Sequence, residues 1–167
     1  LIDDKIGGNW KRLIYERFER AFPEVVDHVI FVPPLPHEKY LGLLNLADAL
    51  LDIPTFSGCN TSIEALAIGA PIITWPQDFM RGRLTAACYK QMGLSDLIAA
   101  DEESYLTLVL RLAQDADFKK RMQVDIKANA YKLFERQEVV REIENFFFAA
   151  YSAWKTGNTL TYLPTAK

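Results

Sequence analysis

The sequence predicts an α/β domain built on a parallel sheet, followed by a helical C-terminal segment. Up to about residue 100, short apolar runs alternate with stretches of helical periodicity, and from residue 101 onward the periodicity is helical only. Parallel strands need long crossover connections, which are usually helices, so this alternation favours a parallel sheet with helices on both faces. The apolar runs carry few polar residues, as strands buried on both faces do. The predicted fold is therefore a doubly wound parallel sheet.

Four short runs are predicted to be strands because they are rich in β-branched, aliphatic or aromatic residues. They span residues 28–32, 49–53, 72–75 and 97–99. Proline bounds the first three: Pro33 follows the first, Pro54 ends the second and Pro71 precedes the third. A proline lacks the N–H group that a strand ladder needs, so each of these prolines favours a strand boundary. The fourth run is the weakest of the four.

Helical spacing of apolar residues predicts seven helices between and after these strands. They are expected at residues 9–22, 40–47, 61–68, 79–92, 101–113, 117–134 and 138–154. Asn9 and Asp101 are residue types that commonly cap a helix start, and Pro23 ends the first helix. Gly69 and Gly93 stand where glycine usually follows a helix, after the third and the fourth. The start and stop signals thus agree with the spacing.

The order of these elements suggests one domain. We expect an α/β core over residues 1–100, C-terminal helices over residues 101–155 packed on the same domain, and a tail over residues 156–167. The last helix carries an apolar side, which either packs on the domain or docks on a partner lobe that is missing here. Because the chain opens at Leu1 and not at methionine, we expect a fragment whose upstream strands are missing.

Composition argues against several classes of protein. Lys and Arg number 19 against 22 Asp and Glu, the net charge is −3, and no basic stripe is present, so a nucleic-acid partner is not expected. No apolar run approaches the roughly 20 residues of a membrane helix. Asp3 and Asp4 stand where a signal peptide would carry basic residues. Cys59 and Cys88 are too few for a disulfide scaffold. We expect a cytoplasmic protein with no membrane partner.

The loop between the second strand and the third helix carries the strongest functional signal. In doubly wound sheets, ligands bind beyond the carboxyl ends of strands, and a helix that begins there offers free N–H groups to a phosphate. Asn60, Thr61 and Ser62 add side-chain donors at that point, and Glu64 could accept hydrogen bonds from ribose hydroxyls. The alternative is that these polar residues are ordinary helix caps. Neither a dinucleotide-binding GxGxxG motif nor a Walker GxxxxGK[ST] motif is present.

Several segments resemble the C-terminal catalytic lobe of O-linked N-acetylglucosaminyltransferases, in particular the bacterial SPINDLY-like branch. They are LADALLD at residues 46–52, NTSIEAL at 60–66, GAPIIT at 69–74, FMRGR at 79–83, and GL with LIA at 93–94 and 97–99. Any one of these motifs is weak, but together they follow the family's order, each on the predicted element. The resemblance covers roughly residues 9–150.

The resemblance implies a GT-B fold of two Rossmann-like lobes, the C-terminal lobe binding a UDP-sugar. It implies transfer of a sugar, usually N-acetylglucosamine, to Ser or Thr hydroxyls of an acceptor protein that the missing N-terminal lobe would bind, with tetratricopeptide repeats upstream. By position, Asn60 and Thr61 match the residues that hold the diphosphate, Glu64 matches the one that binds the ribose, and Tyr40 falls where relatives have a His stacking on uracil. The family needs no metal or other cofactor.

Three further residues are weaker candidates. His37 lies one turn before Tyr40 and is either a ligand contact or an exposed first-turn residue. Arg81 and Arg83 are candidate phosphate contacts, although an Arg inside a helix more often forms a salt bridge. We assign no catalytic residue, because the acid–base groups proposed in relatives lie largely outside this chain.

The chain also departs from the family pattern. Cys59 stands where relatives have His or Gly, Asn60 replaces a Thr, Ala67 replaces a Trp and Leu84 replaces a His. These changes are expected to affect the catalytic rate more than nucleotide binding. The alternative functions are therefore a degenerate, non-catalytic nucleotide-binding domain or a protein-interaction domain that docks through its last helix.

Overall fold

Two of the predicted strands pair in parallel in the computed structural model, which describes residues 8–160. The strand β1 (Leu50–Leu51) lies beside β2 (Ile72–Ile73), with Leu50 opposite Ile72 and Leu51 opposite Ile73. A parallel bridge between Thr74 and Ile98 extends the pairing to the weakest predicted strand. The parallel pairing is therefore confirmed, although each strand is only two residues long.

The full doubly wound sheet is not seen within residues 8–160. Where the sequence predicts a strand at residues 28–32, Val26–His28 form a short 3₁₀ helix, η1, and the residues that follow do not join the sheet of β1 and β2. The side chain of Ile30 is 70% exposed. Val32 forms a single β-bridge, but the run as a whole is not a strand of this sheet, so its β-branched composition alone was not sufficient. The chain is mostly helical with a small parallel sheet.

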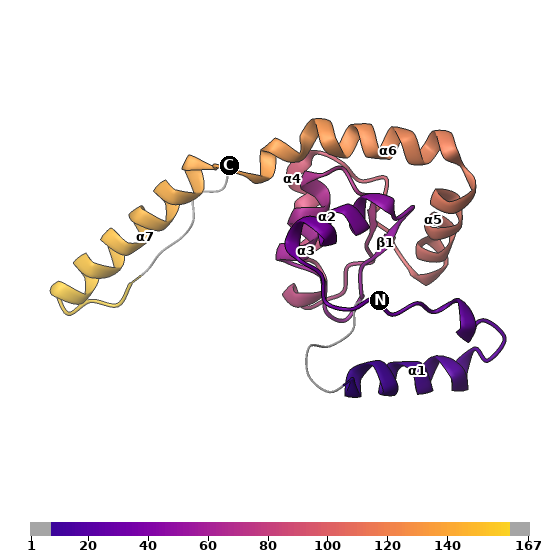
Figure 1. The fold of residues 1–167 in the computed structure, drawn as a ribbon. Coiled ribbons are helices and arrows are strands. Elements are labelled where there is room, and N and C mark those ends of the chain that lie inside the picture. The colour runs from indigo at the N-terminus through magenta and orange to yellow at the C-terminus, as the bar shows by residue number, and fades with distance from the viewer. Residues whose placement is uncertain (1–7, 161–167) are drawn as a thin grey trace.

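Five helices and a 3₁₀ turn surround this sheet (Figure 1). They are α2 (His37–Leu46), α3 (Asn60–Ala67), α4 (Leu84–Met92), α5 (Glu102–Gln114), α6 (Ala116–Asn129) and η3 (Ala130–Leu133). Both α3 and α5 contact β2, and its two residues are buried. Leu66 on α3, Leu112 on α5 and Ile126 on α6 meet in the same apolar core. The helices thus fix the sheet, and with it the loop after β1.

Tyr89 ties α4 to the sheet inside this core. Its side chain is 1% exposed. The Ile72 N–H donates to the Tyr89 hydroxyl over 2.9 Å, and the hydroxyl donates to the Ile72 carbonyl over 2.8 Å. Burial strongly raises the pKa of Tyr89, so the neutral phenol is the form that the fold contains. The hydroxyl satisfies two backbone groups of β2 that would otherwise be buried without partners.

The helix predicted at residues 79–92 begins later than expected. Met80–Gly82 form a 3₁₀ turn, η2, and α4 starts at Leu84. The cause is the loop after β1: the Ser57 N–H donates to the Arg81 carbonyl over 2.7 Å. A Cβ atom at Gly82 would lie 2.5 Å from the Pro54 carbonyl oxygen. Tertiary contacts with this loop thus replace the first helical turn.

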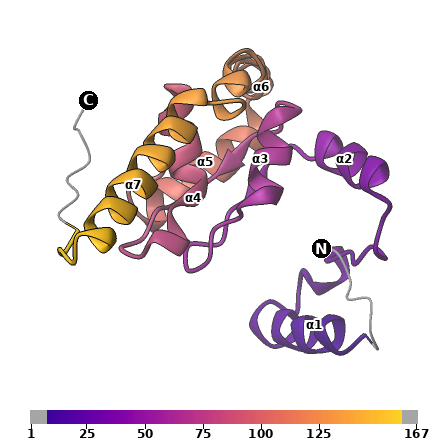
Figure 2. The same cartoon turned by 90° about the vertical axis from the view of Figure 1, so that its left-hand side faces the viewer.

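The first and last helices lie outside the core. The helices α1 (Asn9–Ala21) and α7 (Gln137–Lys155) contain no buried residue. In Figures 1 and 2, α1 is set apart from the body formed by α3 to α6, and Figure 1 shows α7 extending away from it. Among the described C-terminal helices, α5 contacts β2 and α6 contacts α3, whereas α7 contains no buried residue.

The remaining expectations concern the chain ends and the membrane. Of the predicted tail, residues 156–160 follow α7, whereas residues 161–167 lie outside the described part, as do residues 1–7 of the predicted core. Among the described helices, none is long and apolar enough to cross a membrane.

Candidate functional site

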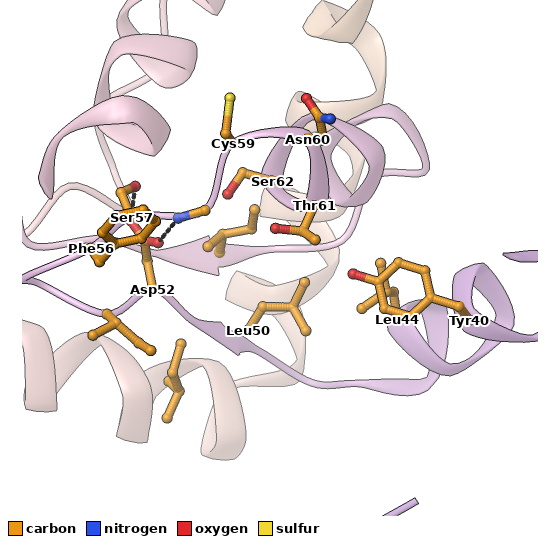
Figure 3. Close-up of a pocket in the computed structure, with 14 residues that line it drawn as sticks. Tyr40, Leu44, Leu50, Asp52, Phe56, Ser57, Cys59, Asn60, Thr61 and Ser62 are labelled. Carbon is orange, nitrogen blue, oxygen red and sulfur yellow. Dashed lines mark hydrogen bonds between the residues drawn. The ribbon is translucent and has the colours of Figure 1, made fainter. Parts of the chain in front are cut away.

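A cavity of about 630 Å³ lies beyond the carboxyl end of β1 (Figure 3). Its walls come from three places: the loop from Asp52 to Cys59, the first turn of α3, and the side of α2 that carries Tyr40 and Leu44; residues of β1 and β2 complete the lining. Leu50 and Ile72 form its apolar floor. The cavity therefore combines apolar surface with the polar start of a helix, as small-molecule sites commonly do.

The start of α3 supplies the donors of this cavity. Cys59 precedes the helix, and no side chain caps it. The first N–H groups of a helix have no partner within the helix, and the helix dipole is positive at this end, so an anion is favoured here. Figure 3 shows the Thr61 hydroxyl on the side that faces Leu50, whereas the Asn60 amide points away from Leu50 and Tyr40. Of the two predicted phosphate residues, Thr61 is thus better oriented toward the cavity.

Tyr40, His37 and Glu64 are brought together from two helices. The His37 Nε2 atom on α2 lies 3.0 Å from the Glu64 Oε1 atom on α3. Tyr40 lines the cavity, and burial, together with the negative charge of Glu64, raises the pKa of its phenol. The tyrosine is therefore neutral near pH 7 and offers a flat ring at one end of the cavity. These three predicted donor-site residues form one cluster.

A polar network that is largely buried borders the cavity, and none of the sequence motifs predicts it. The Asp52 carboxylate, which directly follows β1, accepts three hydrogen bonds: from the Ser57 hydroxyl over 2.6 Å, the Thr74 hydroxyl over 2.8 Å and the Gly58 N–H over 2.8 Å. The Asp52 carbonyl accepts a further bond from the Tyr105 hydroxyl over 3.0 Å. An acidic residue at the end of an apolar strand was the available signal.

Ser62 belongs to this network. Its side chain is 5% exposed, and its Oγ atom lies 2.8 Å from the Thr85 Oγ1 atom on α4. Although Ser62 also borders the cavity, its hydroxyl has a partner on the opposite side. Its expected role as a phosphate donor is therefore less favoured than that of Thr61.

The two arginines do not line the main cavity. The Arg81 guanidinium lies over the Phe79 ring, 4.4 Å from its centroid, and borders a second hollow of about 230 Å³. The Arg83 Nε atom donates to the Gln77 carbonyl over 2.9 Å. Arg81 lies in the 3₁₀ turn η2 and Arg83 directly before α4, so neither is inside the α-helix in which both were expected.

Both cysteines are free thiols. Cys59 is exposed at the cavity, and Cys88 on α4 is half-buried. Burial raises the pKa of the Cys88 thiol, and electrostatic interactions with Cys59 and Asp52 raise it further. Across residues 8–160, no group of three or more His, Cys, Asp and Glu side chains is placed to hold a metal ion.

Comparison with known sequences gives consistent matches. The model of glycosyl transferase family 41 matches residues 18–143. A UDP-N-acetylglucosamine–peptide N-acetylglucosaminyltransferase of Caenorhabditis elegans is 22% identical over 139 residues, which are 82% of this chain and 12% of that protein. An enzyme of the same name from Giardia intestinalis is 25% identical over 154 residues, 90% of this chain and 10% of that protein. A probable SPINDLY transferase of Solanum lycopersicum is 22% identical over 138 residues, 81% of this chain and 15% of that protein.

A solved structure agrees with these sequence matches. A mutant O-GlcNAc transferase of Thermobaculum terrenum superposes with a TM-score of 0.62 at 26% identity, covering 72% of this chain and 26% of that chain. Our chain thus spans about a quarter of that structure, and 10% to 15% of the three sequence relatives.

Proposed function

The chain belongs to glycosyl transferase family 41, and we propose that its cavity is the donor site of a protein O-glycosyltransferase. The complete enzyme would transfer N-acetylglucosamine from UDP to the hydroxyl of a Ser or Thr on an acceptor protein. Relatives with that activity in their names are six or more times longer than the aligned part, so the activity is proposed for the longer protein, and donor binding for this chain.

One observation carries the proposal: the uncapped start of α3 borders a cavity large enough for a nucleotide. The diphosphate would lie against the N–H groups and the Thr61 hydroxyl at the helix start. These groups would stabilise the negative charge that develops on the departing UDP without having to move, which is the electrostatic part of the catalysis. Asn60 would reach the diphosphate after a change of side-chain rotamer.

The nucleoside would lie toward α2. The Tyr40 ring supplies a flat surface on which uracil can stack. Glu64 would accept hydrogen bonds from the ribose hydroxyls, and His37, 3.0 Å from Glu64, would hold that carboxylate in place. Arg81 and Arg83 lie at the turn before α4 and do not line the cavity. They would reach a phosphate only if the turn at residues 80–83 moved toward the cavity.

The described core would be part of a larger lobe. We propose that residues 1–100 and the packed helices α5 and α6 belong to the doubly wound C-terminal lobe of a GT-B enzyme, the acceptor protein being bound by a second lobe. Two free cysteines suit a reducing compartment, and we propose the cytoplasm.

Calorimetric titration tests donor binding directly. The chain is titrated with UDP, uridine, UDP-N-acetylglucosamine, UDP-glucose and GDP-fucose. We expect UDP to bind and uridine to bind much more weakly, because the helix start recognises the diphosphate. Equal affinities for UDP and uridine would contradict that role, and the sugar that adds affinity to UDP identifies the donor.

A second candidate function is supported by α7. Its exposed apolar residues include Ile143, at 51%, and Phe147, at 63%. A protein-interaction domain would use such a helix to dock, and it would bind no nucleotide. The same titration, together with sedimentation at several protein concentrations, separates the two functions: nucleotide binding by a monomer supports the donor site, and a dimer without nucleotide binding supports the interaction domain.

A further inference from the structure

A chain of buried hydroxyl groups connects α4 to the start of α3. The Thr85 Oγ1 atom lies 2.9 Å from the Ser57 Oγ atom and 2.8 Å from the Ser62 Oγ atom. The Thr85 N–H also donates to the Ser57 Oγ atom, over 3.0 Å. Thr85 is completely buried, and Ser57 is 1% exposed. Thr85 does not line the cavity, but both of its partners do.

The protons of this chain can point in only one direction. The Ser57 hydroxyl donates to the Asp52 carboxylate over 2.6 Å, so toward Thr85 it can only accept. The Thr85 hydroxyl must then donate to Ser57, and the Ser62 hydroxyl must donate to Thr85. In this arrangement one proton lies in each of the three contacts, which are Ser57–Asp52, Thr85–Ser57 and Ser62–Thr85. Any other arrangement of the protons leaves one pair of oxygen atoms in contact with no proton between them. The carboxylate of Asp52 thus orients all three hydroxyl groups.

The loop before α3 and the first turn of α3 are in tight contact at the same point. A Cβ atom at Gly58 would lie 2.3 Å from the Ser62 Oγ atom and 2.9 Å from the Thr61 Oγ1 atom. Ser62 shares the first turn of α3 with Asn60 and Thr61, so a displacement of its backbone moves the neighbouring donors as well. Since Thr85 holds both Ser57 and Ser62, it fixes the loop relative to the helix start.

We propose that Thr85 is a positioning residue of the donor site, acting through Ser57 and Ser62 to hold the start of α3 in the orientation that binds a diphosphate. The proposal rests on the proposed function, because the diphosphate is the ligand that the helix start would bind. Its geometric part, the fixed helix start, does not depend on any ligand. The two parts can therefore be tested separately.

The test compares three variants of the full chain. Thr85→Val removes the hydroxyl at nearly constant shape, and Thr85→Ser retains it. Tyr89→Phe is the matched control, because it removes another buried hydroxyl of α4, one that makes two hydrogen bonds but lies outside this network. Each variant is titrated with UDP and with uridine, and the backbone amide exchange of residues 59–62 is measured by NMR without ligand.

We expect Thr85→Val to bind UDP about tenfold more weakly, with unchanged uridine affinity and faster amide exchange at residues 59–62. Thr85→Ser should have the wild-type UDP affinity and the wild-type amide exchange at residues 59–62. Tyr89→Phe should lower the melting temperature without changing the UDP affinity or this amide exchange. If Thr85→Val lowers only the melting temperature, as the control does, Thr85 has no positioning role.

Two further outcomes remain informative. If the wild-type chain does not prefer UDP to uridine, the proposed function is wrong, and the amide exchange alone then decides whether Thr85 orders the helix start. If Thr85→Val does not fold, Thr85→Ala removes the same hydroxyl without placing a second methyl group beside Ser57 and Ser62. Unchanged amide exchange and UDP affinity in Thr85→Ala would overturn the proposal.

Discussion

His37 and Glu64 are separated by 27 positions in the chain, yet the Nε2 atom of one lies 3.0 Å from the Oε1 atom of the other. The pair joins α2 to α3 near Tyr40, which lines the cavity, whereas His37 and Glu64 themselves do not line it. Both side chains are partly open to solvent, 64% exposed for His37 and 35% for Glu64. A contact of this kind adds little to stability, but it fixes the direction of the carboxylate that the proposed donor site uses.

The first prediction concerns Glu64. Glu64→Ala is expected to weaken UDP binding by about 1–3 kcal/mol, the range for lost hydrogen bonds to a charged group. The free energy of unfolding should hardly change, because the side chain is partly exposed. Calorimetry and urea unfolding measure the two quantities. His37→Ala serves as the control for orientation. It should weaken UDP binding less than Glu64→Ala does, and the double variant should bind UDP no more weakly than Glu64→Ala alone.

The second prediction concerns the buried carboxylate of Asp52. Asp52→Asn replaces an acceptor oxygen with an amide group that only donates, so at least one of the donors at Ser57, Thr74 and Gly58 loses its partner. We expect the free energy of unfolding to fall by about 1–3 kcal/mol in urea titrations. The control is Asp48→Asn, which removes only the exposed ion pair with Lys119 and should cost less than about 1 kcal/mol. Similar losses in the two variants would contradict the role given to Asp52.

The third prediction contrasts two glycines. Gly58→Ala places a Cβ atom 2.3 Å from the Ser62 Oγ atom and 2.9 Å from the Thr61 Oγ1 atom, so these two side chains, or the turn that carries them, must shift. Overpacking of this kind costs about 1–3 kcal/mol of stability, and we expect UDP binding to be lost with it. Gly42→Ala, inside α2, meets no atom within 4 Å and should stabilise the chain by up to about 1 kcal/mol. Thermal unfolding and calorimetry of both variants provide the comparison.

The fourth prediction is a loss of stability in alkali. Burial raises the pKa of Tyr89 in the folded chain above its unfolded value of about 10. Above that pH the unfolded chain releases the proton while the folded chain retains it, so the free energy of unfolding falls as the pH rises, by up to about 1.4 kcal/mol per pH unit for this group. Below pH 10, Tyr89 is protonated in both the folded and the unfolded chain, so its full contribution to the free energy of unfolding is present. Urea titrations between pH 8 and about 11 should show a shallower decline in Tyr89→Phe than in the wild type; parallel curves would contradict the assignment.

The fifth prediction concerns catalysis. The chain alone is expected to transfer no sugar to a peptide, because the acceptor hydroxyl must be held about 3–3.5 Å from the anomeric carbon, and we propose that a second lobe holds it. Slow hydrolysis of the donor by water is compatible with this expectation. Mass spectrometry of a Ser/Thr peptide incubated with UDP-N-acetylglucosamine tests it. Efficient modification by the chain alone would contradict the assignment of acceptor binding to another lobe.

Local sequence signals predicted several elements well. The helix expected at residues 61–68 is α3, Asn60–Ala67, and Gly69 follows it with a φ of 85°. Asp101 caps α5, accepting from the Ser104 N–H over 2.8 Å. These features depend on residues within one or two turns of each other, so the sequence contains all the information that they need.

Elements that depend on distant partners were predicted less well. The run at residues 28–32 has the composition of a strand but does not join the sheet of β1 and β2, because local composition does not specify which segment a strand pairs with. The segment at residues 79–83 looks helical, but the Arg81 carbonyl accepts from Ser57, which lies in another loop. In both cases a tertiary contact, or the lack of one, outweighed the local preference.

The sequence by itself determined the helix periodicity, the parallel pairing of strands and, through motifs between residues 46 and 99, the family. Only the tertiary structure decided which polar groups face the cavity. Ser62 looked equivalent to Thr61 in the sequence, but its hydroxyl is bonded to Thr85, 23 positions away. The physical reason is that a hydroxyl takes whichever partner packing brings within 3 Å, and packing between α3 and α4 is a property of the whole fold.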